Sequence, residues 1–242
     1  MKKTLAILLL MLVAGCASKE PLFDTSAVFK EAEENMRTEA FEKARKGYQK
    51  IQERSPDKSY DADLMLRIAD TYYGEEKYSE AQVEYQAFLN YHPVHKDAPY
   101  AQYQIAMCSY KDLTTTDRDP APARVVIKEM RKLVEKYPHS VYEEQARKYI
   151  SICTDWLAEY ELYVAHFYYK KGSYKAAAGR CETLLKDYPG SRSEKDALYY
   201  AGLSYKELGE KALARARFET LAQKYPAMKK TALSNIEKLH LP

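Results

Sequence analysis

Cys16 is the residue of this 242-residue sequence whose surroundings point most directly to a chemical reaction. It follows Ala14 and Gly15, two small residues after an unbroken apolar run over 5–13 that is itself preceded by two lysines. As a helix, the nine residues of that run would span about 14 Å, less than half of the hydrocarbon core of a bilayer, so the run is too short to anchor the chain. These features are typical of a secretory signal peptide, and they make the Cys16 thiol a candidate for lipid attachment.

The segment that ends at Cys16 resembles the lipobox of bacterial lipoproteins. In proteins of that type the cysteine sulfur carries diacylglycerol, the signal is cut before the cysteine, and the new amino terminus receives a further acyl chain such as palmitate. The resemblance implies a signal peptide over 1–15, an acylated Cys16, and a polar tether over 16–25. Ala17, in place of Asp, resembles the pattern sorted to the outer membrane, which implies an anchor in its periplasmic leaflet. The alternative is an ordinary cleaved signal with a chance cysteine.

The other thiols and the imidazoles form no recognisable active site. Cys108, Cys153 and Cys181 are odd in number and no CxxC pair occurs, so we expect buried thiols, with a Cys153–Cys181 disulfide as the alternative. His92 and His95 lie in a predicted turn with no Cys or Asp partner at ligand spacing, so we expect no metal there. Phosphate-binding glycine loops and the GxSxG and HExxH motifs do not occur. The sequence therefore predicts a protein that is not an enzyme and takes no cofactor or metal.

The composition predicts helices joined by short turns. Only 8 residues are glycine, whereas Ala, Leu, Glu, Lys and Tyr are abundant and Tyr alone occurs 23 times. Apolar residues make up 46% and charged residues 30%, which excludes a disordered chain and a polytopic membrane protein. Without the two lysines of the signal, 36 basic residues face 35 acidic ones, so the bulk charge gives no reason to expect nucleic acid.

A spacing pattern recurs along the chain and predicts the elements that position these side chains. A small residue is followed by a second small residue at +12, an aromatic residue or Cys at +16, and Pro at +24. The pattern resembles the tetratricopeptide repeat, in which small residues set the close crossing of two antiparallel helices and Pro ends the second helix. The residues are Ala32, Ala44, Tyr48 and Pro56 in the first unit, Ala69, Ala81, Tyr85 and Pro93 in the second, Ala165, Ala177, Cys181 and Pro189 in the fourth, and Gly202, Ala214, Phe218 and Pro226 in the fifth.

Two units depart from the common length. In the third, 32 residues separate Ala106 from Pro138, and the excess falls on a stretch rich in Thr, Asp and Pro over 114–122, which predicts a longer loop. In the fourth, positions 141–171 contain no Pro or Gly and predict one helix of about 45 Å. We therefore predict an all-α, right-handed α-solenoid over 26–242. Its five tetratricopeptide hairpins cover about 26–56, 60–93, 97–138, 141–189 and 193–226, and a C-terminal capping helix covers 227–240.

One stretch carries a more specific resemblance. It contains Asp117-Arg118-Asp119-Pro120 and Tyr137-Pro138, followed by Leu157-Ala158, Glu161, Val164-Ala165 and Phe167-Tyr168-Tyr169, then Arg180 and Tyr188-Pro189. Together with the lipobox and the extended fourth unit, these residues resemble the BamD family of outer-membrane protein assembly factors, also called ComL or YfiO. The resemblance covers essentially the whole chain after the signal. It is weaker in the first unit, where Asn35 stands at the Tyr position, and in the tail.

The resemblance implies a non-enzymatic lipoprotein subunit of the machinery that folds and inserts β-barrels into the outer membrane. In that family the N-terminal repeats are thought to receive unfolded barrel precursors through their C-terminal β-strand signals. We expect Tyr72, Tyr73 and Tyr103 to line the groove that receives them, because tyrosine offers a large contact area together with a hydroxyl.

The resemblance also implies which proteins this subunit binds. The C-terminal repeats of the family bind the periplasmic domains of the barrel subunit, BamA, and a second lipoprotein, so BamA-like and BamC-like partners are expected. Arg180 matches the family's Arg in the second helix of the fourth unit, which implies a salt bridge to the barrel subunit. Arg118 and Asp119 are further partner-binding candidates.

Less specific interpretations stay open from the sequence alone. Tyrosines at repeat positions are commonly inter-repeat core, and Arg180 can equally be a solvated helix charge. The chain can also be another periplasmic repeat lipoprotein, pilotin-like or coordinating the cell envelope, although the 114–122 loop and the long fourth helix count against this. A lytic or hydrolytic enzyme would need a catalytic domain, and five repeats with a tether leave no residues for one.

Overall fold

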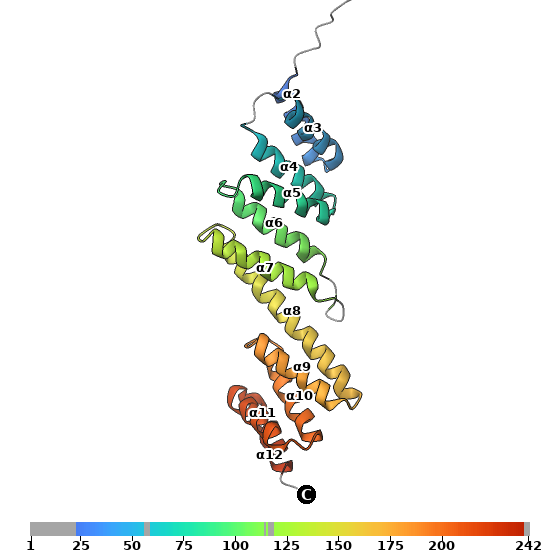
Figure 1. Cartoon of the computed structure of the whole chain (residues 1–242), viewed down its shortest axis with the longest axis vertical. Coiled ribbons are helices and arrows are strands. Elements are labelled where there is room, and N and C mark those ends of the chain that lie inside the picture. The colour runs from blue at the N-terminus through green and yellow to red at the C-terminus, as the bar shows by residue number, and fades with distance from the viewer. Residues whose placement is uncertain (1–22, 56–58, 114, 116–118, 240–242) are drawn as a thin grey trace, which may run out of the picture.

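The computed structural model describes residues 23–55, 59–113, 115 and 119–239, and within these ranges every regular element is helical. The helices follow one another along one elongated array, from α2 at one end to α12 at the other (Figure 1). Each helix packs chiefly against the helix before it and the helix after it. In chain order they are α2 (Thr25–Arg37), α3 (Phe41–Arg54), α4 (Asp61–Gly74), α5 (Tyr78–Tyr91), α6 (Ala98–Lys111), α7 (Ala121–Lys136), α8 (Glu143–Lys170), α9 (Tyr174–Asp187), α10 (Glu194–Glu207), α11 (Lys211–Lys224), the 3-10 turn Pro226–Met228, and α12 (Lys229–Lys238).

The prediction of an all-α solenoid built from tetratricopeptide-like hairpins is confirmed by this arrangement. The hairpins are α2–α3, α4–α5, α6–α7, α8–α9 and α10–α11, and α12 follows them as the last helix. In four cases the last residue of the second helix lies two positions before the proline of the repeat: α5 before Pro93, α7 before Pro138, α9 before Pro189 and α11 before Pro226. Proline lacks the amide that the helix needs and disfavours helical geometry in the residue before it, so these ends follow directly from the sequence.

One backbone turn joins the two helices in four of the five hairpins. The amide after the turn residue donates to the carbonyl five residues before it, at 2.8 to 3.0 Å. This is the hydrogen bonding of a Schellman-type helix end, which requires a residue with left-handed φ. The turn residues are Glu39 (φ 59°), Glu76 (φ 59°), Gly172 (φ 73°) and Gly209 (φ 76°). In the third hairpin α6 ends at Lys111 and α7 begins at Ala121, and none of the residues described between them has a left-handed φ.

The small residues of the repeat pattern lie where helices touch. Each of them is buried, and so are the +16 residues, among them Tyr48, Tyr85 and Phe218 with no exposed surface. At Gly202 the contact leaves no room for a side chain, because a Cβ built there would stand 2.6 Å from the ring of Phe218. The close approach of the two helices in a hairpin therefore depends on side chains no larger than a methyl group at these positions.

The fourth unit differs through the length of its first helix. The single helix expected over 141–171 is α8, whose 28 residues give it a length of about 42 Å. Its first half packs against α7, and its second half extends to α9 and α10 (Figure 1). At the far end, Ala232 of α12 and Leu239 are buried against Phe218 and Leu221, so α12 covers the last apolar face of the array.

Several expectations fall on residues that the structure does not describe. The signal peptide over 1–15, Cys16 and the tether up to residue 22 lie outside the described ranges, as does Arg118. Among the helices that are described, none combines the length and the apolar character needed to cross a bilayer.

We expect Gly202→Ala to destabilise the array and Gly179→Ala to stabilise it, although both glycines lie inside helices. A Cβ at 202 meets the ring of the fully buried Phe218 at 2.6 Å, and overpacking of this kind costs about 1–3 kcal/mol. A Cβ at 179 meets nothing within 4 Å, so the replacement gains the roughly 0.5–1 kcal/mol by which Ala surpasses Gly in a helix. Urea unfolding followed by circular dichroism measures both, and effects of the same sign at the two sites would contradict this packing account.

Candidate functional site

A row of tyrosines connects the first helices of the third and fourth hairpins. Tyr103 of α6 stacks on Tyr142, just before α8, with ring centroids 5.1 Å apart, and its edge meets Tyr149 of α8 at 6.2 Å. Tyr110 meets Tyr149 at 4.8 Å, and Tyr100 meets Tyr142 at 6.0 Å. All five rings are partly buried. We call Tyr100, Tyr103, Tyr110, Tyr142 and Tyr149 the tyrosine ladder.

Two of the three sequence-predicted groove residues come together at this ladder. Tyr73, at the end of α4, and Tyr103 pack against the same apolar cluster, and each is partly buried. Burial raises the pKa of Tyr73 to about 12. Burial also raises the pKa of Tyr103, whose hydroxyl is hydrogen-bonded to Tyr149. Both side chains therefore remain neutral and hold fixed positions at the edge of the core.

Tyr72 lies apart from this group. The guanidinium of Arg45, on α3, sits 4.0 Å above its ring, and the same Arg45 donates to Thr71 and to Glu75 at 3.1–3.2 Å. Arg45 is 7% exposed. Tyr72 therefore belongs to a buried contact that joins the first hairpin to the second.

Asp70 provides a second polar link between hairpins. Its Oδ1 accepts hydrogen bonds from the hydroxyls of Tyr85 at 2.6 Å and Tyr100 at 2.7 Å, which ties α4 to α5 and to α6. Burial raises the pKa of Asp70 even though both hydroxyls favour its charged form. The first hairpin contains an equivalent of the Tyr85–Asp70 hydrogen bond, since the Tyr48 hydroxyl donates to Glu33 at 2.6 Å.

Arg180 pairs within the chain. Its Nη1 lies 3.1 Å from Oε2 of Glu161, with the Arg180 side chain 43% exposed and the Glu161 side chain 6% exposed. One face of the guanidinium thus neutralises a buried carboxylate of α8, while the remaining donors face solvent. Arg180 is therefore not simply a solvated helix charge, since it forms an ion pair within the chain, and its contact with a partner's carboxylate stays a prediction.

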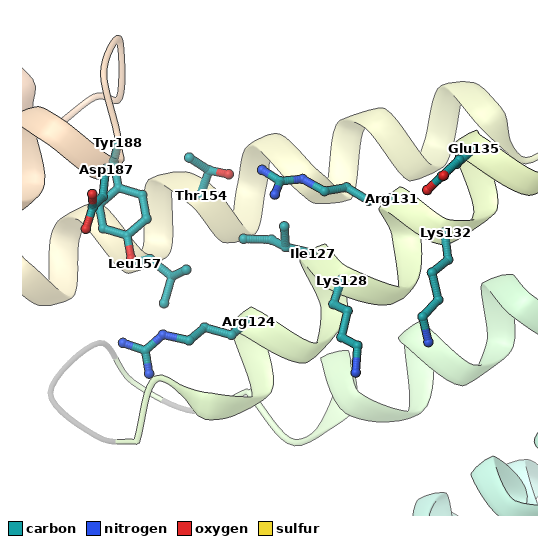
Figure 2. Close-up of a pocket in the computed structure, with 10 residues that line it drawn as sticks. All are labelled: Arg124, Ile127, Lys128, Arg131, Lys132, Glu135, Thr154, Leu157, Asp187 and Tyr188. Carbon is teal, nitrogen blue, oxygen red and sulfur yellow. The ribbon is translucent and has the colours of Figure 1, made fainter.

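A basic groove lies beside this ion pair. It runs between α7 and α8 with a volume of about 470 Å³, and we call it the α7–α8 groove. Ile127 and Leu157 form its apolar base, and Figure 2 shows Arg124 and Arg131 on either side of this base while Lys128 and Lys132 extend the other way. The remaining lining residues are Glu135, Thr154, Asp187 and Tyr188.

The long helix α8 also presents an aromatic face. Trp156, Tyr160, Tyr163 and Phe167 follow one another at spacings of three and four, which places them on one side of the helix. Trp156 and Tyr160 stack with parallel rings. Tyr163 and Phe167 are more than half exposed. The face is uncovered in this half because α7, with 16 residues, is shorter than α8.

The remaining partner candidate has a local structural contact. Asp119 is exposed, and its Oδ1 accepts a hydrogen bond from the amide of Ala121 at 2.9 Å, at the start of α7. A carboxylate there satisfies one of the free amides of the first helical turn.

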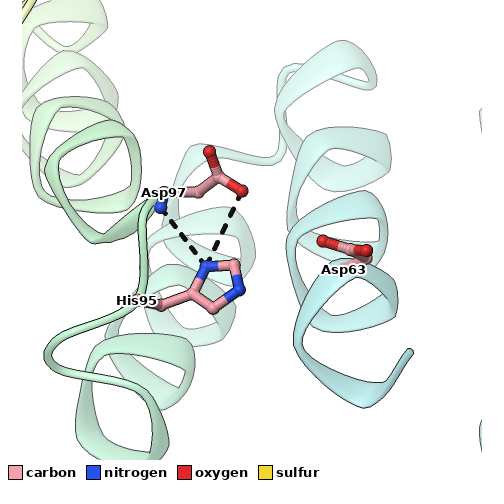
Figure 3. Close-up of side chains that lie close together, drawn as sticks. All are labelled: Asp63, His95 and Asp97. Atoms are coloured by element: carbon pink, nitrogen blue, oxygen red, sulfur yellow. Dashed lines mark hydrogen bonds and ion pairs between the residues drawn. The ribbon is translucent and has the colours of Figure 1, made fainter. Parts of the chain in front are cut away.

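The expectation that His95 has no Asp partner nearby was wrong. Asp97 donates its backbone amide to Nδ1 of His95 at 3.2 Å and places a carboxylate oxygen 3.6 Å from it, and Asp63 of α4 faces the ring from the other side (Figure 3). The ligand atoms of the three residues lie within 4.8 Å of one another. Because Nδ1 already accepts a backbone hydrogen bond and Asp63 is exposed, this group is a polar contact between two hairpins, and the absence of a metal stays a prediction.

The three cysteines in the described part of the chain are buried and are not bonded to one another. Cys108, Cys153 and Cys181 each have 1% exposure or less. Burial raises the pKa of each thiol to about 12. Thiols of this kind are poor nucleophiles at neutral pH, so they serve as small apolar core groups.

Most of the residues that form these sites could not be predicted from the sequence. Tyr142 and Tyr149 lie outside the repeat pattern, and nothing in their spacing shows that they face α6. A basic face of α7 could have been predicted, because Arg124, Lys128 and Arg131 recur in the sequence at the spacing of one side of a helix. The apolar base of the groove required the position of α8.

Comparison with known families gives an extensive match. The family model described as "YfiO: Outer membrane lipoprotein" matches residues 23–221. A protein of Neisseria meningitidis named "Outer membrane protein assembly factor BamD" is 26% identical over 209 residues, which cover 82% of this chain and 78% of that protein. A protein of the same name in Vibrio cholerae is 24% identical, covering 84% of this chain and 90% of that protein.

Solved structures of repeat proteins are also similar. The TPR2AB domain of yeast Sti1, solved as a complex with pHSP90, is 13% identical with a TM-score of 0.49, covering 84% of this chain and 78% of that one. The tetratricopeptide protein YrrB is 17% identical with a TM-score of 0.39, covering 87% of this chain and 91% of that one.

We expect the free energy of unfolding of the wild type to fall, relative to that of Asp70→Asn, as the pH rises above about 4. Burial raises the pKa of Asp70 above its ordinary 3.8, so between the two values the folded chain holds more protons than the unfolded chain. Stability due to this group then decreases as the pH rises through that interval. Asn keeps an acceptor oxygen for the two hydroxyls but does not titrate. Urea unfolding between about pH 4 and pH 7 measures the difference.

Glu194 provides a control, because the change of stability with pH that it causes is expected to have the opposite sign. Burial disfavours its charged form, but hydrogen bonds from Lys224 and Tyr225 outweigh this effect and lower its pKa below 4.5. The wild type should therefore gain stability over Glu194→Gln as the pH rises toward 4.5, between the lowered pKa of the folded chain and the ordinary pKa, so this control is measured from about pH 3 to pH 5. A flat or rising difference between the wild type and Asp70→Asn would contradict the assignment of Asp70 as a buried, disfavoured carboxylate.

Proposed function

The chain belongs to the YfiO family of outer membrane lipoproteins, and on this premise we propose that it is a non-enzymatic subunit of a β-barrel assembly machinery. In this role it holds partner proteins together and receives precursors of outer-membrane proteins for folding and insertion. The observation that carries the proposal is the family match over 23–221, joined by relatives that are named outer membrane protein assembly factors. The matched range contains nearly the whole array of hairpins.

The non-enzymatic part of the proposal is supported by the state of the reactive groups. The buried thiols have raised pKa values, and the buried carboxylates of Asp70 and Glu161 are engaged by tyrosine hydroxyls and by Arg180. Nucleophilic or acid–base catalysis needs an activated group in reach of a substrate. The groups described here are instead committed to joining helices.

Attachment to the outer membrane is assigned to Cys16. A diacylglycerol on its sulfur and an acyl chain on its amino group provide several chains, at roughly 0.8 kcal/mol per buried methylene, which is enough for a stable anchor. The lipobox-like residues before Cys16 and the lipoprotein description of the family support this assignment. The array would then extend from the periplasmic leaflet into the periplasm.

Precursor binding is assigned to the tyrosine ladder together with Tyr73. The rings are held by packing against one another, so a bound segment gains apolar contact with little loss of side-chain entropy. An unfolded barrel strand offers alternate apolar and aromatic side chains with free backbone groups, which fits such a surface. Tyr72 contributes by fixing the second hairpin against the first through Arg45.

Partner binding is assigned to the C-terminal half. The exposed donors of Arg180 are available to a carboxylate of a BamA-like barrel subunit. The aromatic face of α8, with Tyr163 and Phe167 exposed, offers apolar area for a BamC-like lipoprotein or the same subunit. Arg118 and Asp119, which precede α7 in the sequence, remain partner candidates.

We expect affinity purification of the full chain from detergent-solubilised envelopes to recover a barrel protein of the assembly machinery, and the variant Arg180→Met/Glu161→Gln to recover several-fold less. Replacing Arg180 alone would leave the buried Glu161 carboxylate unpaired and destabilise the fold. Replacing both removes the ion pair together with the donors that face the partner. Quantitative mass spectrometry of the recovered proteins measures the effect, and circular dichroism verifies the fold.

The matched control is the ion pair of Arg217 with Glu182, which joins α11 to α9 at 2.6 Å. Arg217→Met/Glu182→Gln should leave recovery of the barrel protein unchanged. Equal recovery in all variants would remove Arg180 from the partner site. Absence of any barrel partner, together with unchanged outer-membrane barrel levels on depletion of the chain, would overturn the proposed function itself.

A further inference from the structure

Helix α7 carries an excess of positive charge. Its 16 residues have a net charge of +3, as do the 14 residues of α3 and of α11. One of its two acidic residues, Glu129, is buried and engaged by Gln102 and Lys132. The outward face of α7 is therefore basic. The charged residues are Arg124, Lys128, Arg131, Lys132 and Lys136 against Glu129 and Glu135.

The two arginines of the α7–α8 groove are not neutralised within the described part of the chain. Lys132 lies 2.9 Å from a carboxylate oxygen of Glu129, and Lys128 lies 4.0 Å from one. Arg124 and Arg131 are exposed and have no carboxylate oxygen within 4.0 Å among the described residues. Arg124 is hydrogen-bonded to the hydroxyl of Tyr188, which fixes its position at one end of the groove. Two guanidinium groups thus flank a recess and retain most of their donors.

The base of the groove adds a requirement for apolar contact. Ile127 and Leu157 are 8% and 3% exposed and lie between the two arginines (Figure 2). A ligand that fills the groove therefore combines an apolar group at its centre with negative charge on both sides. Arg124 and Arg131 are seven positions apart, or about 10 Å along the axis of α7. A peptide of about five residues spans this distance with room for the carboxylates to reach either arginine.

We propose that the α7–α8 groove binds an acidic segment of a partner protein, with one apolar side chain on Ile127 and Leu157 and carboxylates on Arg124 and Arg131. Guanidinium groups bind carboxylates through paired hydrogen bonds, which gives such a site geometric selectivity. The groove's base lies recessed between two helices, so a narrow segment reaches it and a flat bilayer surface does not. Its basic face is one helix long, too short for a continuous track of nucleic-acid phosphates.

This inference goes beyond the proposed function and rests on the groove alone. The groove nevertheless ends next to the assigned partner site, because Tyr188 interacts electrostatically with both Arg124 and Glu161, the partner of Arg180. An acidic segment in the groove and a carboxylate on Arg180 can therefore come from one protein. Peptide binding by the purified chain tests the groove without any other component of the assembly.

The experiment measures fluorescence anisotropy of a labelled peptide, Gly-Ser-Glu-Asp-Leu-Asp-Glu-Ser-Gly, with the full chain in detergent. We expect saturable binding that weakens as salt is raised from about 50 to about 300 mM. Arg131→Glu and Arg124→Gln should each weaken binding by about tenfold or more. Replacing the peptide's Leu with Gly should weaken it several-fold, since the apolar base then lacks a partner. Circular dichroism confirms that each variant is folded.

Lys148→Glu is the matched control, since Lys148 is exposed on the face of α8 opposite Leu157 and should change binding less than twofold. Equal binding by wild type and Arg131→Glu would overturn the proposal, as would binding of a peptide with Lys at the four acidic positions. Short-chain phosphatidylglycerol, added to the same detergent solution, forms the last arm. If it binds the chain in an Arg131-dependent manner and displaces the labelled peptide at lower concentration than the unlabelled peptide does, the groove serves lipid headgroups and the peptide assignment fails.

Discussion

The close approach of the two helices in each hairpin is the constraint on which the rest of the structure depends. It requires side chains no larger than a methyl group where the helices cross, such as Ala69 and Ala81, which have no exposed surface. In the last hairpin the requirement is stricter, since the ring of Phe218 occupies the space in front of Gly202. With the crossing fixed, the apolar face of each hairpin can be buried only by the next one, which makes the array continuous.

The candidate binding surfaces form at two kinds of place: where the stacking of hairpins is complete and where it is interrupted. Between α6 and α8 the stacking brings tyrosines of successive hairpins into contact and forms the tyrosine ladder. The 28 residues of α8 exceed the length of α7, so part of its aromatic face has no neighbour in the array. The α7–α8 groove lies beside this mismatch, and Arg180 lies close to its end. The irregular fourth hairpin thus concentrates the surfaces that are free to bind other proteins.

The fold could be predicted from the sequence, whereas the candidate sites could be predicted only in part. Each position of the repeat pattern has one steric role that returns at the same spacing in successive hairpins. The residues at these positions, such as Ala44, Phe218 and the prolines, therefore define the hairpins. Tyr142 and Asp70 gave no such signal, because their partners lie on other helices and depend on how the hairpins rotate past one another. From the sequence, Arg180 could be a partner-binding residue or a solvated helix charge, and its pairing with the buried Glu161 depends on the packing of α9 on α8.

The most direct test of the central constraint is a double-mutant cycle between Gly202 and Phe218. Phe218→Leu removes the ring atoms that a Cβ at 202 would meet at 2.6 Å. If this contact limits how closely α10 and α11 approach, the cost of Gly202→Ala in free energy of unfolding should be smaller by about 1 kcal/mol or more in the Phe218→Leu background. The same cost in both backgrounds would contradict the claim that close contact at small residues determines the hairpin.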